Sequence, residues 1–345
     1  MANIESACHF DGQVLCTFGG LVHAVRGERV IGSRGRTLYQ SEDGGSTWRP
    51  WISLPVPRTW AALAAPRLLR RVARAHVYHV LPVGGRRFVV FGLRHIFTID
   101  AEPPVIVAQT RLRGSRPLSV AVAGESVYYG EYHSNADRAP MRIFRSNDGG
   151  ERWEAVWEFN NVRHVHAVCY DRFTDTLWAT TGDDDEEAGM WVSSDKFSTV
   201  QRVAGGSQQL RVVELVFTED FVYFGSDTPR ERNFLCRMER DGSNREQLCA
   251  VEGSVFYGRS SNGRLYFSTV CEPSTVNPPK AATLWSSADG RSWAPTVRVR
   301  KDVWPLKLFQ YDQIHLPRGA FESGTVWISL IGTQLDHHSL KLRIP

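Results

Sequence analysis

One short motif recurs along the chain and constrains its fold more than any other feature. Residues Ser41–Trp48 read SEDGGSTW, and residues Ser146–Trp153 read SNDGGERW. Residues Ser287–Trp293 form a third copy that is one residue shorter. In such a segment the aspartate accepts backbone N–H groups, the glycines take positive φ angles, and the tryptophan closes a hairpin onto the core. The repetition predicts an array of similar supersecondary units.

The spacing of the motif aspartates predicts how many units there are. Separations of 105, 47, 46 and 48 residues lie between successive aspartates, which are Asp43, Asp148, Asp195, Asp241 and Asp289. The copies at Asp195 and Asp241 are degenerate. The first gap spans two periods and contains the strand-like segment His95–Asp100, and one further period follows Asp289. Seven periods therefore fill the chain.

Each period contains an apolar run and three further strand-like segments. The apolar runs, which we expect to form the innermost strands, are Leu21–Val25, His76–Leu81, Leu118–Ala123, His164–Tyr170, Val212–Phe217, Val255–Tyr257 and Leu306–Phe309. We therefore predict an all-β fold, a single seven-bladed β-propeller over residues 1–345. The last period lacks a fourth strand, and we expect Val14–Phe18 to supply it by pairing near Leu340, which closes the ring.

One segment does not fit the repeat. In Arg58–Ala75 apolar side chains alternate with arginines, which predicts a short basic helix between blades 1 and 2, packed as a lid on the propeller. The first residues have no secretory apolar region, and no run is long enough to span a membrane, so we expect a cytoplasmic protein without a membrane partner. The six cysteines show no metal-ligand spacing and are expected to be reduced, although Cys236 and Cys249 flank one hairpin.

The type of basic residue is more informative than the net charge of +4. The 41 basic residues include only five lysines, so arginine dominates. A planar guanidinium binds carboxylate, sulfate or phosphate groups through two parallel hydrogen bonds. The positions of the arginines therefore indicate where an acidic ligand binds.

In a propeller, the loops before the innermost strands and the loops between the second and third strands share one face, around the channel mouth. Many basic and histidine side chains map there. We expect the following to bind substrate: His76, His95, Arg116, Arg163, Arg230, Arg232 and Lys307. We predict an acidic glycan as the partner. Nucleic acid is not expected, because this rim mixes acidic with basic residues.

Two histidines give the sharpest local signal. His164 and His166 are two residues apart on a predicted strand, so their side chains lie on the same side. His166 matches His23 of the first blade, which leaves a structural role open, whereas His164 has no such counterpart. His133, beside Tyr132, comes from the adjacent blade and is expected to face the same mouth. Neutral histidine can act as a base or a metal ligand.

An acidic run, Asp183–Glu187, follows in the same blade. It is interpreted either as a solvated surface loop or as a cation site and counter-ion for the neighbouring arginines. Its spacing does not match a calcium-binding loop. The chain also has no phosphate-binding glycine loop, no nucleophile elbow and no paired-cysteine zinc motif.

The repeated motif resembles the Asp-box of sialidases, family 74 glycosidases, sortilin-type receptors and photosystem II assembly propellers. The resemblance implies the fold but not the chemistry, since the boxes take no part in catalysis. A sialidase has a Phe-Arg-Ile-Pro motif before its first box. Here the nearest match, Leu342–Pro345, lies at the opposite end of the chain, so a true sialidase is not expected.

A few residues also resemble propeller polysaccharide lyases that act on uronate-containing chains. Similarity to the oligogalacturonate type implies a divalent metal on His164 and His166, with Asn161 where that family has glutamine. Similarity to the ulvan type implies catalysis by histidines, a tyrosine and an arginine, which are here His133, His164, Tyr132 and Arg211.

Three functions remain open. The first is β-elimination of an acidic polysaccharide, in which Arg211 and Arg163, or a metal on His164, stabilise the enolate while His133 or Tyr132 moves the proton. The second is a non-catalytic propeller that binds an acidic glycan or protein. The third is a glycoside hydrolase that uses two acids such as Glu131 and Asp183.

Overall fold

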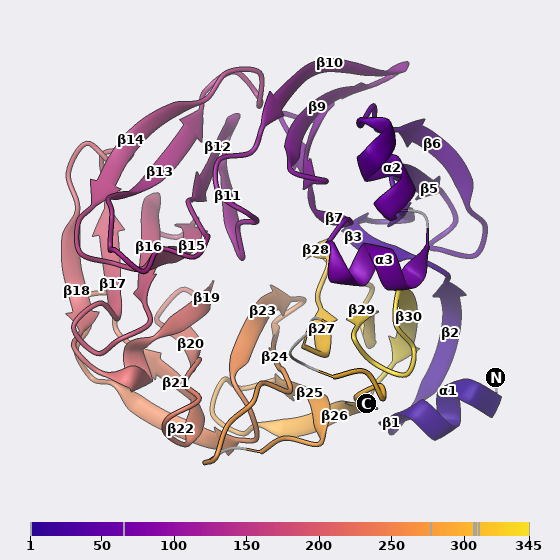
Figure 1. Cartoon of the computed structure of the whole chain (residues 1–345). Helices are drawn as coiled ribbons and strands as arrows, with labels where there is room; N and C mark the ends of the chain where they lie inside the picture. The colour runs from indigo at the N-terminus through magenta and orange to yellow at the C-terminus, as the bar shows by residue number, and fades with distance from the viewer. Residues whose placement is uncertain (1, 65, 277, 306–308, 310, 345) are drawn as a thin grey trace.

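The described residues, which are 2–64, 66–276, 278–305, 309 and 311–344 of a computed structural model, form seven small sheets. The sheets stand around a common axis as the blades of a ring (Figure 1). The predicted all-β, seven-bladed β-propeller is confirmed. In every blade the first strand in the list below is the innermost of those given, and in blade 1 a two-residue strand described below adds to the inner side of that strand.

The first four blades each have four consecutive strands. Blade 1 consists of β3 (Leu21–Arg26), β4 (Arg29–Arg34), β5 (Thr37–Ser41) and β6 (Arg49–Ser53). Blade 2 consists of β7 (Val77–Val83), β8 (Arg87–Gly92), β9 (His95–Ala101) and β10 (Pro104–Arg111). Blade 3 consists of β11 (Val120–Ala123), β12 (Ser126–Gly130), β13 (Met141–Ser146) and β14 (Glu154–Phe159). Blade 4 consists of β15 (His164–Asp171), β16 (Thr176–Gly182), β17 (Gly189–Ser193) and β18 (Gln201–Gly205).

The remaining blades complete the ring. Blade 5 consists of β19 (Val212–Phe217), β20 (Val222–Ser226), β21 (Asn233–Met238) and β22 (Glu246–Val251). Blade 6 consists of β23 (Val255–Ser261), β24 (Arg264–Thr269), β25 (Ala281–Ser287), β26 (Ala294–Arg300) and, outermost, β1 (Cys8–Phe10). Blade 7 consists of β27 (Gln313–His315), β29 (Thr325–Ile331), β30 (His338–Arg343) and β2 (Gln13–Phe18).

Strands from the two ends of the chain close the ring. β2 pairs antiparallel with β30, and Thr17 lies opposite Leu340. Phe18 at the end of β2 is 1 % exposed and stacks on Trp48 with ring centroids 4.0 Å apart. The predicted closure by Val14–Phe18 is therefore confirmed, and blade 1 is packed onto the closing strand by its motif tryptophan.

The innermost strand of blade 7 differs from the expectation. It is β27, whereas the sequence predicted Leu306–Phe309, of which residues 306–308 lie outside the described residues. β27 is only three residues long and contains Gln313 and His315, so it lacks the apolar run that marks the other innermost strands. A two-residue strand, β28 (Arg318–Gly319), then pairs in parallel with β3 and brings this part of the chain to the centre of the ring (Figure 1).

The motif turns have the hydrogen bonds that their residue types predict. In the first, Asp43 accepts the backbone N–H of Thr47 at 2.9 Å, and Trp48 Nε1 donates to the carbonyl of Gly45 at 3.0 Å. The degenerate turn at Asp195 is built in the same way, with a 2.8 Å bond from the N–H of Thr199. These turns join the third and fourth strands of their blades, at the end of the strands opposite the mouth.

The segment between blades 1 and 2 contains two short helices, α2 (Arg58–Ala64) and α3 (Arg67–Val72). Arg71 of α3 is 1 % exposed and forms ion pairs with Asp302, which follows blade 6, and Asp336 in blade 7. The guanidinium also lies 5.1 Å from the ring centroid of Phe309. These contacts attach α3 to the end of blade 6 and to blade 7, although α3 itself follows blade 1 in the sequence.

Two further short elements are α1 (Ala2–Ala7) and a 3-10 helix, η1 (Gln208–Leu210). No helix within the described ranges has the length and apolar character needed to cross a membrane. All six cysteines are free thiols, including Cys236 and Cys249.

Candidate functional site

The candidate site lies at the mouth, where β15 begins and β16 ends. His164 is the first residue of β15 and pairs with Gly182, the last residue of β16. The next residue, Asp183, is thus beside His164 across the hairpin. A shift in strand register between Val165 and Ala167 leaves His166 outside the regular pairing, so its ring is free to turn toward Asp183.

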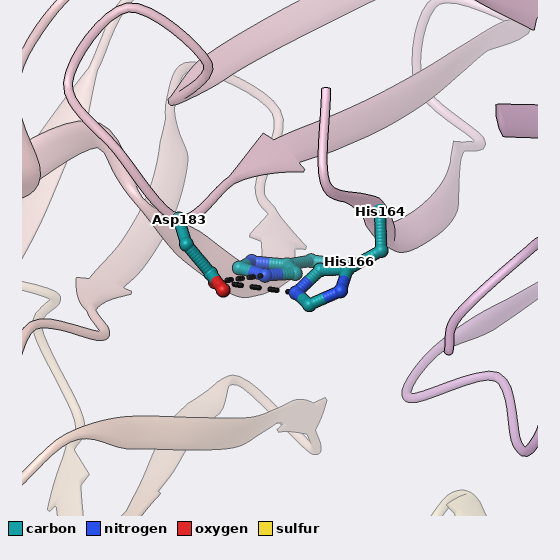
Figure 2. Close-up of side chains that lie close together, drawn as sticks. All are labelled: His164, His166 and Asp183. Atoms are coloured by element: carbon teal, nitrogen blue, oxygen red, sulfur yellow. Dashed lines mark hydrogen bonds and ion pairs between the residues drawn. The ribbon is translucent and has the colours of Figure 1, made fainter. Parts of the chain in front are cut away.

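His164, His166 and Asp183 form a compact group, which we call the histidine–aspartate cluster (Figure 2). The Oδ1 atom of Asp183 lies 3.2 Å from Nε2 of His164 and 3.3 Å from Nε2 of His166. Two arginines approach the same carboxylate. Arg211 Nη2 lies 3.3 Å from Oδ1, and Arg163 Nε lies 3.4 Å from Oδ2.

Backbone carbonyls fix the tautomers of the two histidines. Nδ1 of His164 lies 3.3 Å from the carbonyl oxygen of His133, and Nδ1 of His166 lies 3.2 Å from that of Val212. Because a carbonyl oxygen only accepts, each Nδ1 carries a proton, and each Nε2 faces the carboxylate of Asp183. A proton on either Nε2 forms a hydrogen bond to Asp183; without those protons three acceptor atoms converge, and a cation among them stabilises the arrangement.

Burial and charge oppose each other at this cluster. Burial lowers the pKa of His166 to about 4, while the nearby Asp183 carboxylate acts to raise it. For Asp183 itself, burial acts to raise the pKa, but the two histidines and Arg211 lower it well below its usual range. Asp183 is therefore ionised, and it provides a negative centre in a site with many cations.

A tyrosine covers one side of the cluster. The ring centroid of Tyr132 lies 4.3 Å from that of His164 and 6.1 Å from that of His166. Burial raises the pKa of Tyr132 to about 12, although the charges of Arg116 and Arg211 act to lower it. The phenol therefore keeps its proton at neutral pH.

A second acidic group lies on the other side of Arg211. Nε of Arg211 lies 3.3 Å from Oδ2 of Asp227, the residue that follows β20. Burial raises the pKa of Asp227 to about 8, and the charge of Glu272 acts in the same direction. Burial also raises the pKa of Glu272, which accepts a 2.6 Å hydrogen bond from Ser254. Asp183 and Asp227 are thus two nearby carboxyl groups whose pKa values are shifted in opposite directions.

Two arginines add positive charge to the mouth. Nε of Arg116 is buried and has no hydrogen-bond partner within the described part of the chain. Its charge acts on Tyr78, Tyr132 and Tyr257, which places it among three phenols. Arg74, just after α3, also interacts with Arg116 and Tyr132, and burial lowers its pKa. The two-helix insertion therefore adds a cation to the mouth.

The structure gathers five of the predicted site residues around Asp183, namely Tyr132, Arg163, His164, His166 and Arg211. The ring of His133 is not among them, because its Nδ1 lies 2.9 Å from the carbonyl oxygen of Ser134. His133 instead contributes its own carbonyl to His164. His76 is buried deeper and packs on Tyr78 at 4.5 Å.

The other predicted residues lie elsewhere. His95 is on the third strand of blade 2, where its Nδ1 lies 2.9 Å from the carbonyl oxygen of Leu93. Arg230 pairs with Asp184 at 2.7 Å in an exposed position. Arg232 lines a separate hollow between blades 5 and 6. Lys307 lies outside the described residues.

The acidic run Asp183–Glu187 is largely bound to other groups. Arg138 pairs with Asp184 at 2.8 Å and with Glu187 at 2.5 Å. Gln208 donates to Asp185 at 2.8 Å. Asp184, Asp185 and Glu187 are therefore not part of a freely solvated loop. Two of them, Asp184 and Glu187, are counter-ions of Arg138.

Sequence reasoning did not select Asp227, Glu272 or Arg74. For Asp227 a signal was present: an acid directly follows the second strand in three successive blades, as Glu131, Asp183 and Asp227. In blade 3 this position is structural, since Glu131 accepts the backbone N–H of Arg142 at 3.0 Å. In blades 4 and 5 the acids at this position, Asp183 and Asp227, both face Arg211.

Comparisons with known proteins relate the chain to other propellers. No protein-family model matches the chain, and no curated protein matches its sequence. Among solved structures, a chain of the mitotic checkpoint complex has a TM-score of 0.61 at 9% identity, over 97% of this chain and 93% of that one. An ancestral GH74 enzyme has a TM-score of 0.55 at 14% identity, over 94% of this chain and 44% of that one. YCF48 bound to D1 peptide has a TM-score of 0.50 at 13% identity, over 96% of both chains.

At such low identity these likenesses show the fold alone. The chain is a seven-bladed β-propeller whose mouth carries a histidine–aspartate cluster. Its function has to be inferred from the chemistry of that site.

Proposed function

We propose that this protein binds acidic, uronate-containing oligosaccharides or polysaccharides at its mouth and cleaves them by β-elimination. The observation that carries the proposal is the grouping of Tyr132, His164 and Arg211 around Asp183. Resemblance to propeller polysaccharide lyases supports the same reaction. We infer an acidic ligand from the positive charge of the mouth. The ionised acids there are outnumbered by four arginines, Arg74, Arg116, Arg163 and Arg211.

The reaction requires three kinds of group. A base removes the proton at C5 of the uronate, the electrons of the C5–H bond form the C4–C5 double bond, the C4–O bond breaks, and the leaving oxygen takes a proton. Negative charge develops on the uronate carboxylate as the proton leaves and must be neutralised. The mouth contains a candidate for each step.

We assign proton removal to Nε2 of His164, whose lone pair is fixed by the Nδ1 contact with the His133 carbonyl. Tyr132, held protonated by burial, returns a proton to the leaving oxygen. Arg211 and Arg163 neutralise the carboxylate. This assignment replaces His133, whose ring faces the Ser134 carbonyl, as the group that transfers protons.

The donor set also fits the divalent metal that the lyase resemblance implies. His164, His166 and Asp183 would hold it, since both Nε2 atoms converge with a carboxylate oxygen and would bind the ion once deprotonated. A bound cation would supply the charge that neutralises the uronate carboxylate. A ring that coordinates a metal cannot also accept a proton, so the two roles of His164 exclude each other, and chelation distinguishes them.

A second candidate function rests on a separate observation. Asp183 is ionised while burial raises the pKa of Asp227 to about 8, and such a pair can serve as base and acid in glycoside hydrolysis. In that case Asp227 would protonate the leaving oxygen and Asp183 would activate water.

One assay separates these functions. The protein is incubated with polygalacturonate and other uronate polysaccharides, and the ultraviolet absorbance of unsaturated uronates is followed. A lyase increases this absorbance, a hydrolase releases reducing ends without it, and a binding protein does neither. Binding to uronate oligomers, with no binding to neutral ones, should weaken as salt rises.

Variants then test the assigned residues. His164→Ala and Tyr132→Phe should each lower the rate at least ~100-fold. His9→Ala, on the exposed outer strand β1, is the matched control and should keep the full rate. Full activity in His164→Ala would refute the assigned site even if elimination were observed. If a chelator abolishes activity and added Mn²⁺ restores it, His164 is a metal ligand and not the base.

A further inference from the structure

A second cavity lies at the end of the channel opposite the mouth. It has a volume of about 220 Å³ and lies between the innermost strands β11, β15, β19 and β23. β15 begins at the mouth with His164, whereas the cavity is lined by its other end, from Cys169 onward. This cavity is therefore distinct from the histidine–aspartate cluster.

Three arginines line this cavity. They are Arg172, Arg259 and Arg318. Within the described residues none of the three forms an ion pair, and the Nε atom of Arg259 is buried without a hydrogen-bond partner. Arg318 donates a hydrogen bond to the backbone carbonyl of Val120 across the channel. This neutral acceptor does not neutralise the charge of the guanidinium.

The cavity contains a single carboxylate, Glu214. Its Oε1 atom accepts a 3.0 Å hydrogen bond from Ser119 and lies 3.8 Å from Sγ of Cys169. Burial raises the pKa of Glu214, although Arg259 and Arg318 act to lower it. One carboxylate therefore faces three guanidinium groups, and no direct pair neutralises them.

The two inner arginines also repel each other. Burial lowers the pKa of Arg318 to about 10, and the charge of Arg259 contributes to that shift. Unpaired cations in a desolvated space are costly, and an anion bound between them relieves both the repulsion and the missing hydrogen bonds. A guanidinium group binds planar oxyanions through its fork of N–H donors.

We propose that this cavity is a binding site for a small oxyanion, a phosphate or carboxylate compound, held by Arg259 and Arg318 with Arg172 at the opening. The volume is sufficient for such a ligand, because one water molecule accounts for about 30 Å³ in the liquid. Arg172 is exposed, beside Phe173, which is 41% exposed, so the opening faces the solvent on the side of the motif turns. The site is independent of the function proposed for the mouth.

The inner arginines separate this cavity from the mouth. Glu214, Arg259 and Arg318 also line a smaller cavity on the other side, next to His79 and Tyr257. A ligand in the 220 Å³ cavity thus shares no lining residue with the histidine–aspartate cluster.

Thermal unfolding and calorimetry with two probes test the proposal. Inorganic phosphate and succinate are titrated against sodium chloride at matched ionic strength. We expect saturable binding and a higher Tm with phosphate, succinate or both, and the pair of probes distinguishes a phosphate site from a carboxylate site. No saturable binding of either probe would overturn the proposal.

Variants locate the bound anion. Arg259→Gln should weaken binding at least ~10-fold, because it removes charge-assisted hydrogen bonds. Arg49→Gln, at an exposed position on β6 where Arg49 pairs with Glu42, should leave binding unchanged. If Arg259→Gln binds as tightly as the wild type, the anion is not in this cavity and the proposal is wrong.

A purely structural role for Arg259 predicts a different result. If Arg259 mainly stabilised the fold, Arg259→Gln would lower the Tm in the absence of phosphate. If Arg259 instead serves to bind an anion, the same variant should have a Tm equal to or above that of the wild type without phosphate, because an unpaired, partly buried charge has been removed. Should Arg259→Gln fail to fold, Arg172→Gln at the opening is the second variant and should also weaken binding.

Discussion

The Nε2 atom of His166 lies 3.3 Å from Oδ1 of Asp183, while Nδ1 of the same ring lies 3.2 Å from the carbonyl of Val212. The ring of His166 is thus held between a carbonyl at Nδ1 and a carboxylate at Nε2. His164 repeats the arrangement with the His133 carbonyl. Two such rings beside one carboxylate form a ready set of metal ligands.

The first prediction concerns metal binding. Chelator-treated wild-type protein should bind Mn²⁺ or Zn²⁺ with a stoichiometry of one, as measured by calorimetry. Asp183→Asn should weaken this binding at least ~10-fold, because it removes the only carboxylate in the cluster. His9→Ala serves as the control and should bind normally. Equal affinity in Asp183→Asn would place the metal elsewhere.

The second prediction concerns the ion pairs that fasten α3. Arg71 is 1 % exposed, and the side chains of Asp302 and Asp336 are 8% and 0% exposed. Arg71→Ala removes the guanidinium that these two buried carboxylates share and leaves Asp302 with Lys301 and Asp336 with His337, so the free energy of unfolding should fall by about 3 kcal/mol. Arg49→Ala, which breaks an exposed pair with Glu42, should cost less than about 1 kcal/mol. Chemical denaturation of both variants measures the difference.

The third prediction concerns pH. Burial lowers the pKa of His23 and of His79 to about 3, whereas an unfolded histidine titrates near about 6.5. As the pH falls from about 6.5 toward 3, the unfolded chain binds more protons than the folded one, so the free energy of unfolding decreases. The urea concentration at the midpoint of unfolding should therefore be lower at pH 5 than at pH 7.5.

A variant checks the source of that pH dependence. His79→Gln keeps a group able to hydrogen-bond to the Pro117 carbonyl, which His79 Nε2 contacts at 3.0 Å, but it cannot titrate. The loss of stability between pH 7.5 and 5 should therefore be smaller in this variant. An unchanged pH profile would show that other groups are responsible.

The fourth prediction concerns ring closure. Phe18 is buried and stacks on Trp48, and β2 is held only by β30 within its sheet. Phe18→Ala should lower the free energy of unfolding by about 3–5 kcal/mol, as expected for a large side chain removed from a core. Phe173→Ala, at a 41% exposed position, is the control and should have little effect on stability. Similar Tm values for the two variants would mean that the closing strand contributes little.

The sequence predicted the architecture because propeller blades repeat. The spacing of Asp43, Asp148 and Asp289 depends only on blade length, and the apolar runs mark most innermost strands. It did not predict β27, because a three-residue strand containing Gln313 and His315 has no apolar pattern to detect. Nor did it indicate that the turn at Asp195 keeps its hydrogen bonds although Lys196 and Phe197 occupy the positive-φ positions.

The candidate site was predicted in part for a similar reason. His164 and His166 are two residues apart on a strand, so strand alternation predicts that they share a side. The register shift between Val165 and Ala167, which sets the direction of the His166 ring, is not visible in the sequence. The choice of Asp183 from a run of five acids depends on where β16 ends, which the sequence does not specify. The direction of the His133 ring and the approach of Arg74 from α3 depend on tertiary contacts between segments far apart in the chain.

Arg318, on β28, donates a hydrogen bond to the carbonyl of Val120 on the other side of the channel, and this contact limits how a ligand can enter the ring. This side chain, with Arg259 and Glu214, lines both cavities along the axis, so within the described residues these three side chains obstruct the central tunnel between the two faces. Whatever occupies the mouth must arrive and depart by the same opening. Long chain-like ligands can therefore lie across the mouth but cannot thread through the ring.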